Sequence, residues 1–152
     1  MRSLFLIGGL PGCGKTTLAN AIACTGLANG NEMVAADDYF VDGDGVYRFN
    51  PKNLPQAHEQ CQGRTADAME GGRDCVVVHN TFSQRWEMEP YFQMASRFGY
   101  RVTVVSLFDG GCTDEELAER NEHGVPVDGI ARMRSRWEHD WRTADTRPPW
   151  ER

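Results

Sequence analysis

The sequence contains very little lysine: Lys15 and Lys52 are the only two in 152 residues. Acidic residues outnumber Lys and Arg by 22 to 16, which gives a formal net charge of −6 at pH 7. Proteins that coat long nucleic-acid duplexes through the phosphate backbone are usually basic. The charge therefore argues against tight, sequence-independent coating of DNA or RNA, while a local basic patch remains compatible with a nucleic-acid substrate.

The sequence also lacks a long apolar run and any C-x-x-C pair. A membrane-spanning helix needs about 20 consecutive apolar residues, so no membrane partner is expected, and no signal peptide is expected before the first strand. The odd number and wide spacing of the cysteines argue against disulfides and zinc, and suit a reducing, cytoplasmic location. The cysteines are Cys13, Cys24, Cys61, Cys75 and Cys112.

Residues 9–16 read GLPGCGKT, a complete G-x-x-x-x-G-K-T phosphate-binding loop. An apolar run over residues 3–7 predicts a strand before the loop, and residues 16–23 predict a helix after it, as this motif requires. Backbone N–H groups of such a loop surround phosphate oxygens, Lys15 reaches the β- and γ-phosphates, and the Thr16 hydroxyl holds Mg²⁺. We therefore expect ATP and Mg²⁺ as cofactors, with GTP as the open alternative to ATP. The expected nucleotide-binding residues are Gly9, Pro11, Gly12, Cys13, Gly14, Lys15, Thr16 and Thr17.

Strand and helix patterns alternate along the chain, which predicts a parallel sheet with helices on both faces. The expected strands are residues 3–7, 32–36, 75–79 and 101–107, and further helices are expected over 54–71, 86–98 and 127–141. A capping box at 113–116 opens a short helix that ends near residue 121. The predicted fold class is α/β: a three-layer P-loop NTPase fold with about four strands and a helical lid near the C-terminus. Residues 1–152 are expected to form one domain.

The carboxyl ends of the strands are where sites form in open parallel sheets. Asp37 and Asp38 follow the second expected strand directly. Asp37 is expected to be the general base that takes the proton of an acceptor hydroxyl, and also a ligand of Mg²⁺. Asp38 is expected to contact the substrate, to support Mg²⁺ or to cap the loop. The alternative for both residues is a solvated turn.

Two motifs of other nucleotide-binding classes are missing. No apolar strand ends in the Asp-Glu pair of motor ATPases, and the Asn-Lys-x-Asp guanine motif is absent. Both absences favour a kinase over a motor or a switch. Asn80 and Thr81, at the end of the third expected strand, are then candidate contacts for the acceptor; capping of the turn that follows is the alternative.

Residues 116–133 are expected to fold as a helical lid that brings Arg120 to the nucleotide and the transferring phosphate. An exposed arginine without a catalytic role is the alternative. His123 follows, and either contacts the nucleotide or shapes the turn of the lid. Among the aromatic residues near the acceptor side, one or two are expected to stack on a base and the others to lie in the core. These aromatic residues are Tyr39, Phe40, Tyr47, Phe49 and Trp86.

These motifs, in this order, resemble the P-loop kinases of the polynucleotide kinase-like family over nearly the whole chain. The resemblance rests on the phosphate loop, on residues 37–39, on Asn80-Thr81 followed by residues 86–91, and on residues 116–121. The run RNEHGV at 120–125 is typical of 5′-polynucleotide kinase modules of vertebrate multidomain proteins and of bacteriophage enzymes that phosphorylate 5-hydroxymethyluracil in DNA. The resemblance implies that Lys15 and Thr16 bind nucleotide and Mg²⁺, that Asp37 is the general base and that Arg120 is a lid arginine.

The sequence departs from the polynucleotide kinase pattern at residues that are expected to recognise the acceptor. Phe40 stands where that enzyme has an arginine that grips substrate phosphate, and a second lid arginine is replaced near His123. Asn80 stands in place of an acidic residue, whereas Thr81 matches an acceptor-side threonine. Phe40 is therefore expected to contact the substrate, and its flat ring suits a base better than a phosphorylated end.

The sequence thus predicts an ATP- and Mg²⁺-dependent kinase that acts on a hydroxyl of nucleic acid, with DNA as the expected partner. The acceptor is either a hydroxymethylated pyrimidine base or a 5′-hydroxyl end. Two alternatives stay open. One is a small-molecule kinase for a nucleoside, sugar or antibiotic, which the acidic charge would suit. The other is a nucleotide-binding regulatory module without an acceptor.

Overall fold

A four-stranded parallel sheet organises the fold. The computed structural model describes residues 1–23 and 29–152, so Cys24 lies outside the described residues. The strands are β1 (Ser3–Gly9), β2 (Asn31–Val34), β3 (Cys75–Asn80) and β4 (Arg101–Phe108), in the spatial order β2-β3-β1-β4. All three pairings are parallel, so every strand ends at the same edge of the sheet. The predicted parallel sheet is confirmed.

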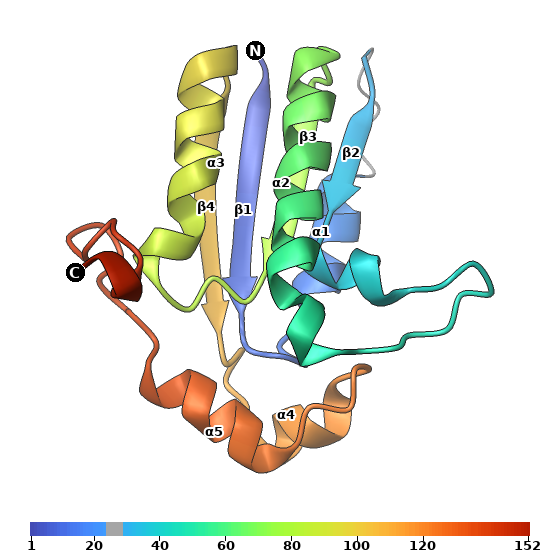
Figure 1. The fold of residues 1–152 in the computed structure, drawn as a ribbon, viewed down its shortest axis with the longest axis vertical. Coiled ribbons are helices and arrows are strands. Elements are labelled where there is room, and N and C mark those ends of the chain that lie inside the picture. The colour runs from blue at the N-terminus through green and yellow to red at the C-terminus, as the bar shows by residue number, and fades with distance from the viewer. Residues whose placement is uncertain (24–28) are drawn as a thin grey trace.

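Helices cover both faces of this sheet and make the three predicted layers (Figure 1). The helices α2 (Leu54–Glu70) and α3 (Arg85–Phe98) lie on one face, and α1 (Lys15–Ala23) lies on the other. Alternate residues of the strands face the two layers: Leu6 and Val78 pack towards α2 and α3, while Ile7 and Val77 pack towards α1. Both sides of β1 and β3 are therefore buried, as their nearly continuous apolar runs predict.

The helices α4 (Asp114–Arg120) and α5 (Val127–Ser135) form a pair beyond the carboxyl ends of the strands, at the lower end of Figure 1. The predicted capping box opens α4: Thr113 accepts a hydrogen bond from the Glu116 N–H at 3.2 Å, and Glu116 accepts one from the Thr113 N–H at 3.2 Å. A small core of Leu10, Leu117 and Ile130 joins this helical pair to the phosphate loop. The predicted helical lid thus lies next to the nucleotide-binding motif.

Two predicted element boundaries are wrong. The strand predicted over 32–36 ends at Val34, and Asp37 and Asp38 lie in a short 3₁₀ helix, Ala36–Phe40. The Asp38 carboxylate accepts a hydrogen bond from the Ala35 N–H at 3.0 Å, which caps this helix and ends the strand. The last helix ends at Ser135 and not at residue 141, because the Glu138 N–H turns to the Ser83 carbonyl at 2.8 Å.

The remaining segments are short. Two further 3₁₀ helices are Pro51–Asn53 and Pro149–Glu151. Among the described residues, no helix has both the length and the apolar character needed to cross a membrane.

Candidate active site

The phosphate loop has the backbone shape that its glycines permit. Gly12 and Gly14 adopt left-handed φ values of 84° and 104°, which favour glycine because other residues are strained there. A side chain at Gly14 would meet no atom within 4 Å, so the loop is open on that side. A side chain at Gly12 would lie 2.7 Å from the Leu117 carbonyl oxygen, so the loop touches the end of α4 at this point.

The Lys15 side chain curls back over the loop. Its Nζ donates hydrogen bonds to the carbonyl oxygens of Gly9 at 2.7 Å and Leu10 at 3.1 Å. Burial lowers the pKa of Lys15 below its usual range, while negative charge on Asp37 acts in the opposite direction. A partly buried ammonium that bonds to neutral carbonyls is well placed to exchange them for phosphate oxygens, which are charged acceptors.

The other loop residues divide into exposed and buried groups. Thr16 and Thr17 are exposed in the first turn of α1, so their hydroxyls are accessible to a ligand. Cys13 is buried, and burial raises the pKa of its thiol, which therefore stays protonated as a packing group. The open loop amides, Lys15 and the exposed Thr16 hydroxyl suit a nucleotide phosphate with Mg²⁺.

Asp37 lies between two segments that are distant in the sequence. Its Oδ1 accepts a hydrogen bond from the Tyr47 hydroxyl at 3.0 Å, and its Oδ2 lies 3.4 Å from His123 Nε2. The Tyr47 and His123 rings also contact each other, with centroids 4.2 Å apart. Burial and the neighbouring Asp37 raise the pKa of Tyr47, so its hydroxyl stays protonated and donates to the carboxylate. Half of the Asp37 side chain is still exposed, which leaves it accessible to an acceptor.

Asp38 is held by the protein itself. Besides capping the 3₁₀ helix, its Oδ2 accepts a hydrogen bond from Arg64 Nη1 at 2.9 Å. Arg64 comes from α2 and also lies 3.5 Å from Glu32 on β2. The capping role considered for Asp38 is therefore present, and contact with a substrate stays a prediction.

Asn80 and Thr81 join the end of β3 to its surroundings. The Asn80 side chain is buried: its Oδ1 accepts a hydrogen bond from the Ala36 N–H at 2.8 Å, and its Nδ2 donates to Cys61 Sγ at 3.6 Å. These contacts favour positioning of the 3₁₀ helix over contact with an acceptor. The Thr81 carbonyl accepts a hydrogen bond from the Gly9 N–H at 3.0 Å, so Thr81 lies beside the phosphate loop.

The carboxyl end of β3 also carries His79, whose register partner on β1 is Ile7. Burial lowers the pKa of His79, and Asp38 acts in the opposite direction. The imidazole is therefore neutral at physiological pH.

Arg120 ends α4 beside the phosphate loop. A Cβ at Gly12 would lie 3.4 Å from the Arg120 Cβ, and the Arg120 guanidinium donates to Cys112 Sγ at 2.9 Å. Arg134, by contrast, is tied to Asp109 at 2.6 Å and to Asp114 at 2.8 Å. In the part of the chain that the structure describes, Arg120 pairs with no carboxylate, and of these two lid arginines it is the one next to the nucleotide motif.

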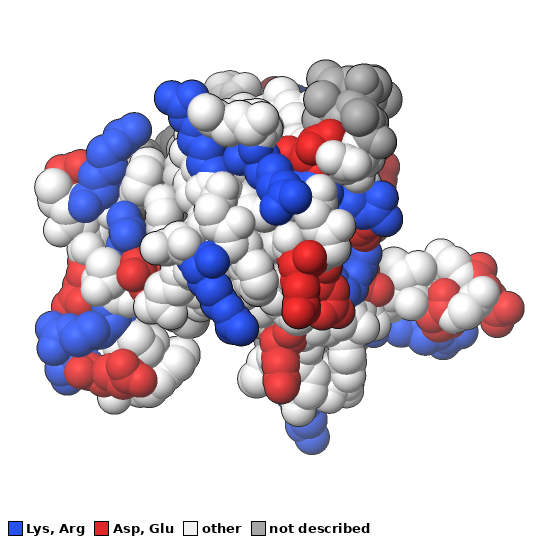
Figure 2. Space-filling view, turned by 90° about the horizontal axis from the view of Figure 1, so that it is seen from above, with Lys and Arg blue, Asp and Glu red and all other residues white. Residues whose placement is uncertain are grey.

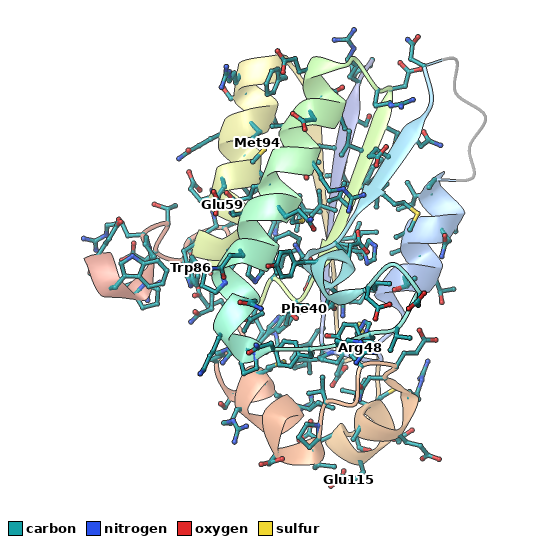
Figure 3. The ribbon with its side chains drawn as sticks, turned by 45° about the vertical axis from the view of Figure 1, so that its right-hand side comes forward. Phe40, Arg48, Glu59, Trp86, Met94 and Glu115 are labelled. Carbon is teal, nitrogen blue, oxygen red and sulfur yellow. The ribbon has the colours of Figure 1, made fainter. Side chains whose placement is uncertain are left out.

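Phe40 and Trp86, the two aromatic candidates labelled in Figure 3, lie in different places. Phe40 is only 5% exposed and packs edge-on against Tyr39, Tyr47 and Phe49. These rings cover Phe40 in this structure, and contact between Phe40 and the substrate stays a prediction. Trp86 packs against Trp150 of the C-terminal tail, with centroids 5.1 Å apart, in a groove of about 490 Å³.

Three site contacts were not predicted from the sequence, and one of them is the contact of His123 with Asp37. No role was predicted for Arg64. Tyr47 was a candidate for stacking on a base but was not predicted to donate a hydrogen bond to Asp37. No local motif could identify Arg64, because its partner Asp38 lies on a different element. For Tyr47 as well, no local motif indicates that its hydroxyl reaches Asp37, ten residues earlier in the chain.

Comparison with known proteins identifies a family and several relatives of this chain. The AAA domain family model matches residues 4–139. NEDD4-binding protein 2 of Homo sapiens is 37% identical over 135 residues, which cover 86% of this chain and 7% of that protein. The 2′,3′-cyclic-nucleotide 3′-phosphodiesterase of Rattus norvegicus is 28% identical over 145 residues, covering 92% of this chain and 32% of that protein. The chain thus spans a third or less of the length of these relatives.

Solved structures agree on the fold. A chain of the Pnkp1/Rnl/Hen1 RNA repair complex superposes with a TM-score of 0.71 at 18% identity, over 97% of this chain and 47% of that one. A putative kinase from Chloroflexus aurantiacus gives a TM-score of 0.56 at 20% identity, over 78% of this chain and 64% of that one. The architecture is therefore that of a P-loop NTPase-like domain, and the chain belongs to the AAA domain family.

Proposed function

We propose that this chain, as a single domain, is a kinase that transfers the γ-phosphate of ATP to a hydroxyl of nucleic acid. The observation that carries the proposal is the surroundings of Asp37. A half-exposed carboxylate, held by Tyr47 and by His123 of the lid, lies within electrostatic reach of Lys15. A phosphate loop with a positioned carboxylate is the arrangement that phosphoryl transfer to an alcohol needs.

The residues have distinct roles in this proposal. The acceptor oxygen attacks the γ-phosphorus, the bond from that phosphorus to the β–γ bridging oxygen breaks, and ADP leaves. Asp37 takes the proton of the hydroxyl, while Lys15 and Arg120 stabilise the negative charge that spreads over the transferring group. Mg²⁺, held by Thr16 and Asp37, would neutralise phosphate charge when bound.

Nucleic acid is favoured as the acceptor class by the resemblance of the motifs and by the relatives. One superposed structure comes from an RNA repair complex, and the phosphodiesterase relative is named for a cyclic nucleotide. Within this class, the proposed acceptors are a 5-hydroxymethyluracil base in DNA and a 5′-hydroxyl end. The net charge of −6 supports the competing small-molecule kinase, since such an acceptor needs no extended basic surface.

The deciding experiment is an acceptor panel with γ-labelled ATP and Mg²⁺. It contains oligonucleotides with internal 5-hydroxymethyluracil and blocked ends, unmodified oligonucleotides with free 5′-hydroxyls, and free nucleosides and sugars. Internal label supports the base-directed reaction, and label at 5′ ends supports the end-directed one. Label on a nucleoside or sugar alone overturns the nucleic-acid proposal. ATP hydrolysis that no acceptor changes, with no transfer, indicates the regulatory module.

A further inference from the structure

The chain between the 3₁₀ helix at Ala36–Phe40 and α2 forms a short hairpin, residues 41–49. Figure 1 shows it extending beyond the β2 edge of the sheet, and Figure 2 shows it as a projection from the body of the molecule. Val41 pairs with Tyr47 in antiparallel fashion. The Asp42 carboxylate closes the turn by accepting hydrogen bonds from the N–H groups of Asp44 and Val46, both at 2.9 Å. The hairpin therefore has a defined backbone although it projects into solvent.

Two rings of this hairpin lie nearly parallel. The Tyr47 and Phe49 planes differ by 9°, with centroids 6.4 Å apart. The buried Phe40 ring packs edge-on beneath both, at 6.1 Å from Tyr47 and 5.0 Å from Phe49. Phe49 is nevertheless 51% exposed. Phe40 thus holds in place an aromatic ring of which about half is accessible to a ligand.

The same pair of rings is joined to the proposed general base. The Tyr47 hydroxyl donates to Asp37 Oδ1 at 3.0 Å, so the position of Phe49 is fixed relative to that carboxylate through one hydrogen bond and one ring contact. Exposed aromatic rings beside a reacting centre are the surfaces on which proteins stack nucleobases.

We propose that Phe49 is the stacking platform for a nucleobase of the acceptor strand, and that Tyr47 sets the position of this platform relative to Asp37. The inference rests on the proposed function, since it names the part of the substrate that this surface holds. A base flipped from a duplex or located at a strand end has a free face for such a contact.

The charges of the hairpin favour a base over a phosphate. Arg48, labelled in Figure 3, is its one basic residue, and its Nε is bonded to Asp42 at 2.8 Å. Asp44 adds a further negative charge at the turn. The hairpin therefore carries no surplus cation to neutralise a phosphate, and the recognition that remains is stacking on the exposed ring.

The test compares Phe49→Ala with Phe49→Trp, using whichever oligonucleotide the wild-type protein phosphorylates. For Phe49→Ala, the KM for the oligonucleotide should rise about 5- to 100-fold, the range for losing one aromatic stack on a base. Phe49→Trp should keep a KM close to that of the wild type. The KM for ATP should not change, and the slope of log KM against log salt should stay the same, because no phosphate contact is lost. Trp150→Ala, which removes an exposed aromatic ring from the tail, is the matched control and should leave the KM for the oligonucleotide unchanged.

A binding measurement without ATP supplies a second readout. An oligonucleotide with 2-aminopurine at the acceptor position should lose fluorescence on stacking with the wild-type protein, and Phe49→Ala should abolish this quenching. A wild-type KM for Phe49→Ala, a reduced salt slope, or an equal effect of Trp150→Ala overturns the platform and leaves the proposed function standing. Failure of the wild-type protein to label any oligonucleotide overturns the proposed function and the platform together.

Discussion

His123 in the turn between α4 and α5 places its Nε2 3.4 Å from Oδ2 of Asp37 in the 3₁₀ helix that follows β2. The lid therefore reaches across the carboxyl edge of the sheet and contacts the proposed general base. An acceptor must approach Asp37 beside this contact, because Tyr47 occupies the other carboxylate oxygen. Both neighbours orient the carboxylate before any substrate binds, which is the preorganisation that proton transfer benefits from.

Replacing Lys15 with alanine should abolish phosphotransfer while the fold is retained. Among the described residues, the Lys15 ammonium donates hydrogen bonds to two loop carbonyls, and its expected role is to stabilise charge on the transferring phosphate. Phosphotransfer at saturating ATP and Mg²⁺ measures the effect, and circular dichroism checks the fold. Turnover close to that of the wild type would rule out this role.

The two neighbouring aspartates should behave differently. Asp37→Asn should lower turnover by roughly 10²–10⁴ with little effect on nucleotide affinity, the usual scale for loss of a general base. Asp38→Asn should mainly lower the free energy of unfolding, by up to about 1 kcal/mol, because it loses a half-exposed ion pair with Arg64. Steady-state kinetics and urea denaturation of both variants separate the roles. Loss of turnover in Asp38→Asn alone would mean that the general base is Asp38.

Arg120→Ala should lower turnover more than it weakens ATP binding, since an arginine beside the loop acts on transition-state charge. Arg132→Ala is the control, because the Arg132 side chain is exposed and lies 3.6 Å from the equally exposed Asp128. Kinetics and equilibrium binding of ATP are measured for both variants. A loss of ATP affinity with unchanged turnover would assign Arg120 to ground-state binding.

Asn80→Ala should destabilise the protein by about 1–3 kcal/mol, because the buried Ala36 N–H loses its hydrogen-bond acceptor. The 3₁₀ helix that carries Asp37 should lose its fixed position as well, so turnover should fall even at temperatures where the variant is folded. Chemical denaturation and kinetics at low temperature measure the two effects. Full stability combined with a raised KM for the acceptor would instead indicate direct contact between Asn80 and substrate.

The parts of the fold that follow local patterns could be predicted from the sequence. Apolar runs gave β1 and β3, periodicity gave α2 and α3, and the capping box at Thr113 gave the start of α4. Each of these patterns lies within one segment of the chain, so it can be recognised in a single sequence without knowledge of contacts between segments. The convergence of the phosphate loop, Asp37 and the lid followed from the rule for parallel sheets.

The features that could not be predicted from the sequence depend on contacts between distant segments. The end of the last helix is set by a hydrogen bond from Glu138 to Ser83, and the burial of Phe40 is set by rings of the following hairpin. The pairing of Asp38 with Arg64 joins two elements whose register no local motif encodes. Such contacts override local propensity, and a sequence pattern gives no distance between segments.

The close approach of Gly12 to the end of α4 links two parts of the molecule thermodynamically. The same backbone that would face the phosphates of a bound nucleotide also lies against Leu117 and Arg120. A ligand that binds better when α4 packs against the loop also stabilises that packing. Because coupling free energies are reciprocal, a substitution that stabilises this packing raises the affinity for the ligand by the same coupling free energy. Nucleotide affinity should therefore report on packing of the lid, even for substitutions in α4 or α5 that touch no nucleotide.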